Sequence, residues 1–592
     1  MSKIKEKILN NSMATFLLGS GIGILVFLWI YGVEVLDVTN VAWLLDSQEI
    51  EGLWDLKQHY LGWVLYRNTP WTFPIGLLDG VAAESISVAY TDSIPLFAIF
   101  FKILSPILPE SFQYFGLFEL LTYALIGGLG SLITYRFTKN IYFNGICGLF
   151  FVISPVLTKR VFYHSALSAH FLILAAICLW IYRDQIGKKR YIVYWGLLSM
   201  LCTLINPYYV PMVLGILLCS LLQEFIVKRN LWHCILCAGI PAVLSLAIGW
   251  PLGLFYGQVS AAAEGIEKVS FNLNQFINPG NSMLIHDGKT LRFSYTCVSA
   301  ILRGQPLHSD WQNEGFAYLG LGVLLAMAVI IIMTVKRAMG GLKQHCEVEK
   351  LSYIIAILVG IIVFTLLAMG PVGTWNATEL YHIPWPEKIY QLFAVFRTAG
   401  RLIWPVYYGL MALTFIGIIR FLSSERRRLM LLLCCLVLQL IDLWPSLKDK
   451  HDKYSHVAED YSFENELMAS ELWSYLGESG SEIIFGVPTG MTICFYPYWS
   501  CTFEEYAIAY GLQMSASYCS RDVSMMADAY AVENFRKRED GKTYPSVIYV
   551  FLFDDMIENH EGINMNLYRW GTIVLGTDLD LTEYSDEVEA IR

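Results

Sequence analysis

Apolar segments long enough to cross a membrane recur along the chain from residue 13 to residue 447. A helix needs about 20 apolar residues to cross a hydrocarbon core of ~30 Å. The first run, Met13–Val33, follows three lysines and lacks a small-residue cleavage site, so it is expected to remain as an anchor. Ten further spans are predicted near residues 113–135, 141–158, 164–183, 191–206, 208–227, 232–254, 316–336, 352–370, 402–422 and 428–447. The pattern therefore predicts an α-helical polytopic membrane protein with about eleven transmembrane helices.

The basic residues between these segments predict how the chain is oriented. Short loops rich in Lys and Arg stay on the cytoplasmic side. Such clusters are Arg136 with Lys139, Arg183 with Lys188–Arg190, Lys228 with Arg229, Lys336 with Arg337, and Arg426–Arg428. This assignment places the N-terminus in the cytoplasm and puts the loops 34–112, 257–315 and 371–401 outside it. A multi-pass protein of the cell membrane is therefore expected, with its C-terminal domain extracytoplasmic.

One apolar stretch, Ile94–Leu108, has no place in this arrangement. If it crossed the bilayer, Arg136 and Lys139 would lie outside. A juxtamembrane helix lying in the outer interface removes the conflict. The alternative is an ordinary span, which gives twelve crossings and breaks the charge rule once.

The pattern changes after Leu447, where polar residues become frequent. Short runs rich in β-branched and aromatic residues occur at 482–487, 546–553 and 572–575, and a helical stretch at 463–476 precedes them. This predicts a small α/β domain at 448–592 that follows a transmembrane domain at 1–447.

Composition agrees with this organisation and excludes several functions. Hydrophobic residues make up 55% of the 592 residues and charged residues 16%, which does not describe a soluble globule. The net charge of −10 argues against a nucleic-acid partner, which would need a basic face. Glycines within two predicted spans favour close helix packing over a phosphate loop; they are Gly19, Gly21, Gly23, Gly127, Gly128 and Gly130.

Candidate chemistry is concentrated in the first outer loop. From Leu53 to Tyr66, apolar and aromatic residues alternate with Asp55, Gln58 and His59, as in an amphipathic helix at a membrane interface. The polar residues either belong to a site or form a solvated stripe, because positions four apart share one helix face. The residues by themselves leave both interpretations open.

The order of motifs in this loop resembles a known family. Asp55, Trp71 and Pro74, followed by the run Asp-Ser-Ile-Pro-Leu at 92–96 and an apolar helix, are similar to the first outer loop of GT-C superfamily glycosyltransferases. That superfamily includes protein O-mannosyltransferases and the transferases that attach aminoarabinose to lipid A. Its members carry an acidic residue shortly after the first span, and a proline-rich segment opens a juxtamembrane helix. In this chain that helix would be Ile94–Leu108.

Further segments follow in the family's order. The runs EGFAYLG at 314–320 and FRTAGR at 396–401 are similar to bacterial YfhO-like membrane proteins and a related uncharacterised bacterial family. The segment after Ser154-Pro155 resembles an outer turn where the superfamily often places a second acidic residue. This chain carries His164 and His170 there instead, which departs from the family pattern.

The resemblance implies transfer of a sugar from a polyprenyl-phosphate donor to an outward-facing acceptor. The acceptor would be a glycan, lipid or protein of the cell envelope, and the membrane lipid is a further partner. Such a reaction needs a base for the acceptor hydroxyl, and the family pattern points to Asp55. Asp92 is the second catalytic candidate, either orienting the acceptor or completing an optional divalent-metal site for Mg²⁺ or Mn²⁺. The sugar itself is not specified.

Basic residues are the expected ligands of the donor. Arg397 and Arg401 suit its phosphate, because a guanidinium matches phosphate oxygens. Arg160 is a third candidate, and for all three the alternative is extension to lipid headgroups. Gln58, His59, His164 and His170 are further binding candidates, although structural hydrogen bonding is the commoner role for the last two. Glu314 either binds sugar hydroxyls or stabilises a helix N-terminus.

Two other functions stay open. A transporter or flippase of lipid-linked envelope precursors would place ionisable groups near the bilayer midplane, often in repeated halves. A non-catalytic GT-C-like assembly protein would account for the acidic residue that is replaced by histidines near position 164. The glycosyltransferase is the primary prediction.

Overall fold

The computed structural model describes residues 2–46, 54–257, 266–280, 297–339, 348–394, 398–461, 463–486, 497–521, 523–539, 546–552 and 565–591. The chain forms two compact units, each assembled from separate stretches of sequence. Unit 1 comprises residues 1–38, 114–248 and 263–457, and unit 2 comprises 39–113, 249–262 and 458–592. The first outer loop therefore belongs to the same unit as the C-terminal region, whereas the sequence grouped it with the transmembrane domain. The predicted boundary at 447 lies inside a helix, α17.

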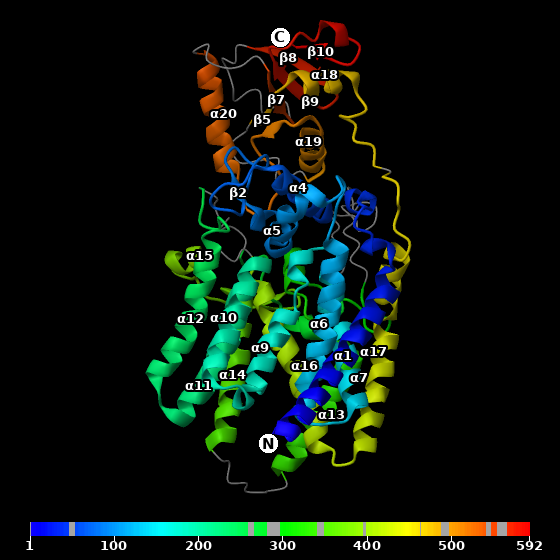
Figure 1. Ribbon diagram of the computed structural model, residues 1–592, viewed down its shortest axis with the longest axis vertical. Coiled ribbons are helices and arrows are strands. Elements are labelled where there is room, and N and C mark those ends of the chain that lie inside the picture. The colour runs from blue at the N-terminus through cyan, green and yellow to red at the C-terminus, as the bar shows by residue number, and fades with distance from the viewer. Residues whose placement is uncertain are drawn as a thin grey trace. The chain divides into compact units, whose positions relative to one another are not determined.

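Unit 1 is mainly helical (Figure 1), and its described residues include a short hairpin. Its longer helices are α1 (Ser2–Tyr31), α6 (Phe115–Tyr135), α7 (Ile141–Val152), α8 (Pro155–Arg160), α9 (Phe171–Ile181), α10 (Lys188–Ile205), α11 (Tyr209–Lys228), α12 (Leu231–Gly249), α13 (Leu321–Met339), α14 (Val348–Met369), α15 (Glu387–Ala394), α16 (Trp404–Phe421) and α17 (Glu425–Tyr454). The hairpin pairs β3 (Val372–Trp375) with β4 (Thr378–His382). Between α7 and α8 the helix is interrupted before Pro155, whose ring cannot continue the hydrogen-bond ladder.

Nine helices among the described residues are long and apolar enough to span a membrane. They coincide with nine of the predicted spans, so the chain is a helical membrane protein. The remaining two predictions correspond to Ser165–Ile181, which has only 17 residues, and to α10. The first turn of α10 contains Lys188, Lys189 and Arg190, which lower its apolar character. Whether these two segments cross the bilayer stays a prediction.

Glycines let α1 pack closely against α6. A Cβ on Gly19 would lie 2.2 Å from the carbonyl oxygen of Gly127, and one on Gly23 would lie 2.1 Å from that of Tyr123. Real Cβ atoms do not approach other atoms so closely, so a larger residue at either position would force the helices apart. The predicted packing role is therefore confirmed for five of the six glycines, since small residues allow close helix packing, whereas a Cβ on Gly21 would meet nothing within 4 Å.

Unit 2 is built around a mixed six-stranded sheet with the strand order β10-β8-β9-β7-β5-β6. Its strands are β5 (Glu482–Phe485), β6 (Gln513–Met514), β7 (Val547–Phe551), β8 (Asn566–Trp570), β9 (Ile573–Thr577) and β10 (Glu589–Ala590). β5 is parallel to β6 and β7, whereas the other pairs are antiparallel. The three predicted strand runs are confirmed as β5, β7 and β9. The helices of this region are α18 (Glu471–Ser479), α19 (Pro497–Tyr510) and α20 (Ser524–Glu539) (Figure 1).

The predicted helix at 463–476 begins later than expected. Helix α18 starts after Ser470, whose hydroxyl accepts a hydrogen bond from the Trp473 amide at 3.2 Å. A serine at this position satisfies an otherwise unpaired amide of the first turn, so it sets the helix start. The residues before it form turns.

The first outer loop is attached to the edge of this sheet. It contains α2 (Ala42–Leu45), α4 (Asp55–Asn68), the pair β1 (Leu77–Leu78) and β2 (Ile86–Ser87), and α5 (Pro95–Leu104). The amide of Ala83 donates to the Ser515 carbonyl at 2.9 Å, next to a bridge between Ala82 and Ala516. Helix α4 packs against α19. The loop and the C-terminal region therefore fold together around one core.

Helix α4 was predicted correctly as a helix, but its polar side chains are buried and do not form an exposed face. Lys57, Gln58 and His59 are at most 3% exposed, and Trp63 is fully buried. These polar residues do not form a solvated stripe. Helix α19 and the turn at 91–93, which lie far apart in the sequence, both pack against α4 and cover them. The indole of Trp63 donates to the Phe112 carbonyl at 2.9 Å, so it holds helix α4 against the C-terminal end of the first outer loop.

Helix α5 is too short to cross a bilayer. Its ten residues rise about 15 Å, half of a ~30 Å hydrocarbon core. It nevertheless exposes Phe100, Ile103 and, in the following turn, Ile107. An apolar face on a helix of this length is what an interfacial position requires, and that position stays a prediction.

Candidate functional site

The first group of candidate residues lies in unit 2 on α4 and on two segments that pack near it, and is named the Asp55 cluster: Asp55, Asp92, Tyr518 and Arg521. Asp55 is the first residue of α4 and is partly exposed. The hydroxyl of Tyr518 donates a hydrogen bond to Asp55 Oδ1 at 3.0 Å. A hydrogen bond to the carboxylate stabilises its charged form and fixes its orientation.

Asp92 lies in a turn that packs against α4. Ser93 Oγ donates to the His59 carbonyl at 2.7 Å, and Thr91 Oγ1 lies 2.8 Å from Ser93 Oγ. A Cβ on Gly62 would lie 2.5 Å from the Thr91 side chain, so only glycine allows this approach. Because Asp55 is one helical turn before His59, the turn places Asp92 beside the same helix as Asp55.

The backbone of this turn is strained. Asp92 and Ile94 both have a φ of 52°, in the left-handed region. For the β-branched Ile94 this conformation is a genuine outlier that costs on the order of 1–3 kcal/mol. Strain of this kind persists where surrounding contacts enforce it, and it is concentrated at functional sites. The strained turn therefore supports a functional role for Asp92.

Two members of the cluster, Tyr518 and Arg521, were not predicted from the sequence. Tyr518 follows Ser517 near the edge strand β6, and Arg521 places its guanidinium 5.2 Å from the centre of the Tyr90 ring. The amide of Ser520 donates to the Tyr90 carbonyl at 2.8 Å, which joins the two segments. The run Tyr-Cys-Ser-Arg at 518–521 matches no motif, so only its mixture of aromatic and basic residues could have drawn attention to it.

Behind the cluster, α4 and α19 share buried charges. Lys57 Nζ lies 2.8 Å from Glu505 Oε2 and 4.0 Å from the centre of the Phe463 ring. The neighbouring Glu504 is fully buried and accepts a hydrogen bond from Ser517 Oγ at 2.5 Å. Burial raises the pKa of Glu504 to about 8, although Ser517 and Lys57 oppose the change. Glu504 is therefore mostly protonated in folded unit 2 at neutral pH.

Glu504 predicts a pH dependence of stability. Its pKa is raised on folding, so its contribution is fully present below the unfolded pKa of about 4.3 and is lost as the pH rises toward 8. We expect the free energy of unfolding to fall by a few kcal/mol over this window, and Glu504→Gln to remove most of that fall. Denaturant unfolding between pH 5 and 8 measures it. Glu505→Gln, which breaks the Lys57 pair, is the control and should lower stability at every pH. Equal slopes in wild type and Glu504→Gln would contradict the assignment.

The second group lies in unit 1 and is named the Glu314 cluster: Lys159, Arg160, His164, Glu314 and Arg401. Glu314 Oε2 accepts hydrogen bonds from Arg160 Nη2 at 2.9 Å and from Arg401 Nη2 at 2.8 Å and Nε at 3.0 Å. Arg160 Nη1 also lies 3.2 Å from His164 Nδ1. The Arg160 side chain is 1% exposed and that of Arg401 11%. This burial excludes extension of either side chain to lipid headgroups.

A pair of glycines brings this cluster together. Glu314 precedes Gly315, and Arg401 follows Gly400. A Cβ built on Gly400 would lie 2.9 Å from the Gly315 Cα, so the two backbones touch where a side chain would not fit. The close approach places Glu314 and Arg401, which are 87 residues apart, within hydrogen-bond distance.

The cluster carries more positive than negative charge. Two guanidiniums face one carboxylate, and Lys159 adds a third basic group, which donates to the Asn313 carbonyl at 3.2 Å. Burial alone would raise the pKa of Glu314, but the charges of Arg160 and Arg401 outweigh it and hold the pKa well below its usual range. Aromatic rings of Trp404 and Tyr208 lie 5.4 and 5.0 Å from the two guanidiniums.

The predicted residues thus divide between the two units. Gln58 and His59 are in unit 2 with Asp55 and Asp92, whereas Arg160, His164, Glu314 and Arg401 meet in unit 1. His170 lies apart from the cluster's ion pairs: its Nδ1 is 2.6 Å from the Tyr408 hydroxyl, the structural hydrogen bond expected of it. Arg397 lies outside the described residues. Within the described part of the chain no group of three or more His, Cys, Asp or Glu residues has the arrangement of a metal site.

Glu314 makes contacts that neither sequence-based interpretation included. Its Oε2 accepts hydrogen bonds from two arginines, and binding of sugar hydroxyls by this residue stays a prediction. The sequence could not show these contacts, because Arg160 and Arg401 are separated from Glu314 by 154 and 87 residues.

A family profile described as a domain of unknown function, DUF6311, matches residues 20–444. This region is well over half of the chain. The chain belongs to the DUF6311 family. The DUF6311 region contains the whole Glu314 cluster together with Asp55 and Asp92, and it ends before Tyr518 and Arg521. No curated protein matches the sequence.

Proposed function

We propose that this DUF6311 protein is a membrane glycosyltransferase that moves a sugar from a polyprenyl-phosphate donor to an acceptor of the cell envelope. The proposal includes about eleven crossings, a cytoplasmic N-terminus and an extracytoplasmic unit 2. The observation that carries it is the Glu314 cluster, a buried group with excess positive charge in a membrane protein. A phosphate attached to a lipid needs such a group beside apolar helices.

The position of the Glu314 cluster favours a site at one end of the membrane spans. Arg160 is the last residue of the candidate span Ile141–Arg160, and Arg401 is the third residue of Ala399–Phe421. Guanidiniums bind phosphate oxygens with two parallel hydrogen bonds and keep their charge next to lipid. They are therefore suited to hold the phosphate of a lipid-linked donor.

Asp55 is the proposed base. The acceptor hydroxyl gives its proton to the carboxylate while its oxygen forms a bond to the anomeric carbon of the sugar. The bond from that carbon to the phosphate oxygen breaks on the opposite face, and polyprenyl phosphate leaves with the electron pair. The product therefore has the inverted anomeric configuration. Tyr518 orients Asp55, and Asp92 orients the acceptor.

Reconstituted protein tests this proposal directly. The full chain in vesicles would be given polyprenyl-phosphate sugars labelled in the sugar, together with an extract of envelope glycans, lipids and proteins. We expect label in an acceptor and equimolar release of polyprenyl phosphate. Nucleotide sugars serve as the control donor and should transfer nothing. Failure of every polyprenyl-phosphate sugar to react would contradict the proposal.

Transport of a lipid-linked precursor is the second candidate, and one observation favours it. Glu119 is fully buried within the candidate span Phe115–Tyr135, where its Oε2 accepts a hydrogen bond from Ser168 Oγ at 2.6 Å. Ionisable residues buried in membrane helices commonly mark transport pathways. Movement of a lipid-linked sugar between leaflets that stops in Glu119→Gln, without sugar transfer, would select this function.

A further inference from the structure

A pocket in unit 1 shares no lining residue with either cluster. Its volume is about 270 Å³, and its walls come from the ends of α10, α11, α12 and α14 and from the turn at Arg183–Gln185. These helix ends carry the basic clusters that predict the cytoplasmic side. Pockets that hold whole drug-sized ligands measure about 300–1,000 Å³, so this one suits a smaller group.

The centre of the pocket is a buried carboxylate. Glu224 is 6% exposed and pairs with Arg183, with Lys228 Nζ at 3.1 Å and with His233 Nε2 at 3.6 Å. Arg183 Nη1 also donates to the Ser220 carbonyl at 2.7 Å. These contacts neutralise Glu224 and hold the floor of the pocket in place.

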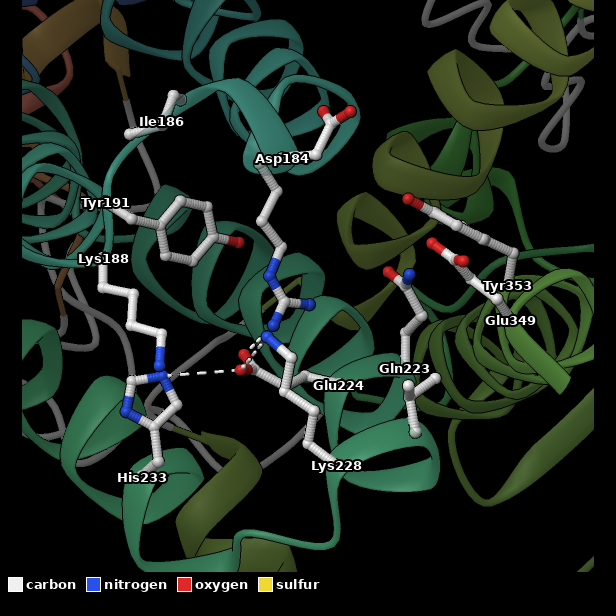
Figure 2. Close-up of a pocket in the computed structure, with 12 residues that line it drawn as sticks. Asp184, Ile186, Lys188, Tyr191, Gln223, Glu224, Lys228, His233, Glu349 and Tyr353 are labelled. Atoms are coloured by element: carbon white, nitrogen blue, oxygen red, sulfur yellow. Dashed lines mark hydrogen bonds and ion pairs between the residues drawn. The ribbon is translucent and has the colours of Figure 1, made fainter.

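The two sides of the pocket differ in charge. Figure 2 shows Lys188 and His233 on one side of Glu224, with Glu349 and Tyr353 on the other. Among the described residues, neither Lys188 nor Glu349 has an ion-pair partner. Lys188 begins α10 and Glu349 lies in the first turn of α14, so both are held by helices.

The formal charges of the lining residues balance. Arg183, Lys188 and Lys228 are opposed by Asp184, Glu224 and Glu349. A purely anionic ligand would meet the unpaired carboxylate of Glu349, and a purely cationic one would meet Lys188. A zwitterion that reaches both sides of the pocket would satisfy both, with its anion at the lysine and its ammonium beside Glu349 and the Tyr353 ring.

We propose that this pocket binds a phosphoethanolamine group, with the phosphate at Lys188 and Lys228 and the primary ammonium at Glu349. A phospholipid headgroup of the adjacent leaflet and free phosphoethanolamine share this chemistry. Lysines and arginines in pockets between the cytoplasmic ends of membrane helices are known to hold the phosphates of lipid headgroups, and Glu349 adds a contact for the ammonium. The proposal does not depend on glycosyl transfer.

Lipid competition tests it with the full chain. Protein in phosphatidylcholine nanodiscs would receive equal amounts of phosphatidylethanolamine and phosphatidylglycerol, and the lipids that remain bound after purification would be quantified by mass spectrometry. We expect phosphatidylethanolamine to be retained in preference. Lys188→Gln should lower retention of both lipids about fivefold, the factor that corresponds to ~1 kcal/mol for one cation near a phosphate.

Glu349→Gln gives the decisive result. It should remove the preference for phosphatidylethanolamine while leaving phosphatidylglycerol bound, because only the ammonium contact is lost. Lys189→Gln is the matched control: it removes the same charge from the same helix turn outside the pocket lining, and it should change nothing. Both test positions are exposed, so folding should persist, and monodisperse elution checks it.

Free phosphoethanolamine separates the two sources. If free phosphoethanolamine displaces the bound lipid only at large excess, the lipid headgroup is the ligand. If free phosphoethanolamine binds more tightly than the lipid, and Lys188→Gln weakens its binding by the same factor, a soluble ligand occupies the pocket. Equal retention of both lipids that neither Lys188→Gln nor Glu349→Gln alters would overturn the proposal. So would a loss of the same size in Lys189→Gln.

Discussion

Replacing Asp55 with asparagine is expected to lower the rate of sugar transfer by about 10²–10⁴-fold, the usual contribution of a positioned general base. Asparagine has nearly the same shape and still accepts the hydrogen bond from Tyr518, which is 3.0 Å from Asp55 Oδ1. It cannot take the acceptor proton. Folding should therefore persist while sugar transfer is lost. The transfer rate at a saturating concentration of labelled donor measures the loss of the chemical step in the folded variant.

Two further variants show whether the loss belongs to Asp55. Tyr518→Phe removes one hydrogen bond to a charged acceptor and should lower the rate about tenfold, consistent with ~1.5–3 kcal/mol for such a bond. Glu110→Gln removes an exposed carboxylate from the same unit and should have no effect. If Asp55→Asn keeps the wild-type rate, Asp55 is not the base, although transfer itself would still support the proposed function.

The second large effect concerns stability. Glu314→Gln should destabilise unit 1 by about 3–5 kcal/mol, because it leaves two buried guanidiniums without their carboxylate. Thermal or denaturant unfolding in detergent micelles measures this change. Asp184→Asn is the control: it breaks the Arg136 pair, whose side chains are 33% and 60% exposed, and it should cost at most ~1 kcal/mol. Equal effects in the two variants would contradict the role assigned to the Glu314 cluster.

The same carboxylate predicts a response to acid. The two arginines depress the pKa of Glu314 on folding, so its stabilising contribution is fully present above the unfolded pKa of about 4.3 and is completely lost once the pH has fallen through the lower, folded pKa. Wild-type unit 1 should therefore lose this stability progressively as the pH falls from about 4.3 toward the folded pKa. Glu314→Gln should show no such acid transition, and unfolding measured across the acid range distinguishes them.

The sequence was most informative where a property depends on neighbours along the chain. Nine predicted spans coincide with apolar helices, and three predicted strand runs are strands. Helix α4 was also found, because the alternation from Leu53 to Tyr66 has a helical period. The buried environment of α4 was not predicted, because burial of Lys57 and His59 depends on α19, which begins more than 400 residues later.

For the candidate sites too, the sequence predicted individual residues but not the contacts between residues far apart in the chain. Asp55, Asp92, Arg160, Glu314 and Arg401 were all selected from motif order, but the side chains that contact Asp55 and Glu314 were not predicted. Glu314 pairs with two arginines, and its binding of a sugar stays a prediction. Tyr518 was not considered, because it is 463 residues from the Asp55 it contacts.

The sequence by itself therefore determined that this is a helical membrane protein, where its long helices lie, and which acidic and basic residues deserve testing. Hydrophobic period and segment length are local properties, so they are readable from residue order. Only the tertiary structure decided that the first outer loop folds with the C-terminal region and that Glu314 joins Arg160 to Arg401. The Glu314 contacts arise where Gly315 and Gly400 allow two backbones to touch, and residue order does not record which surfaces meet.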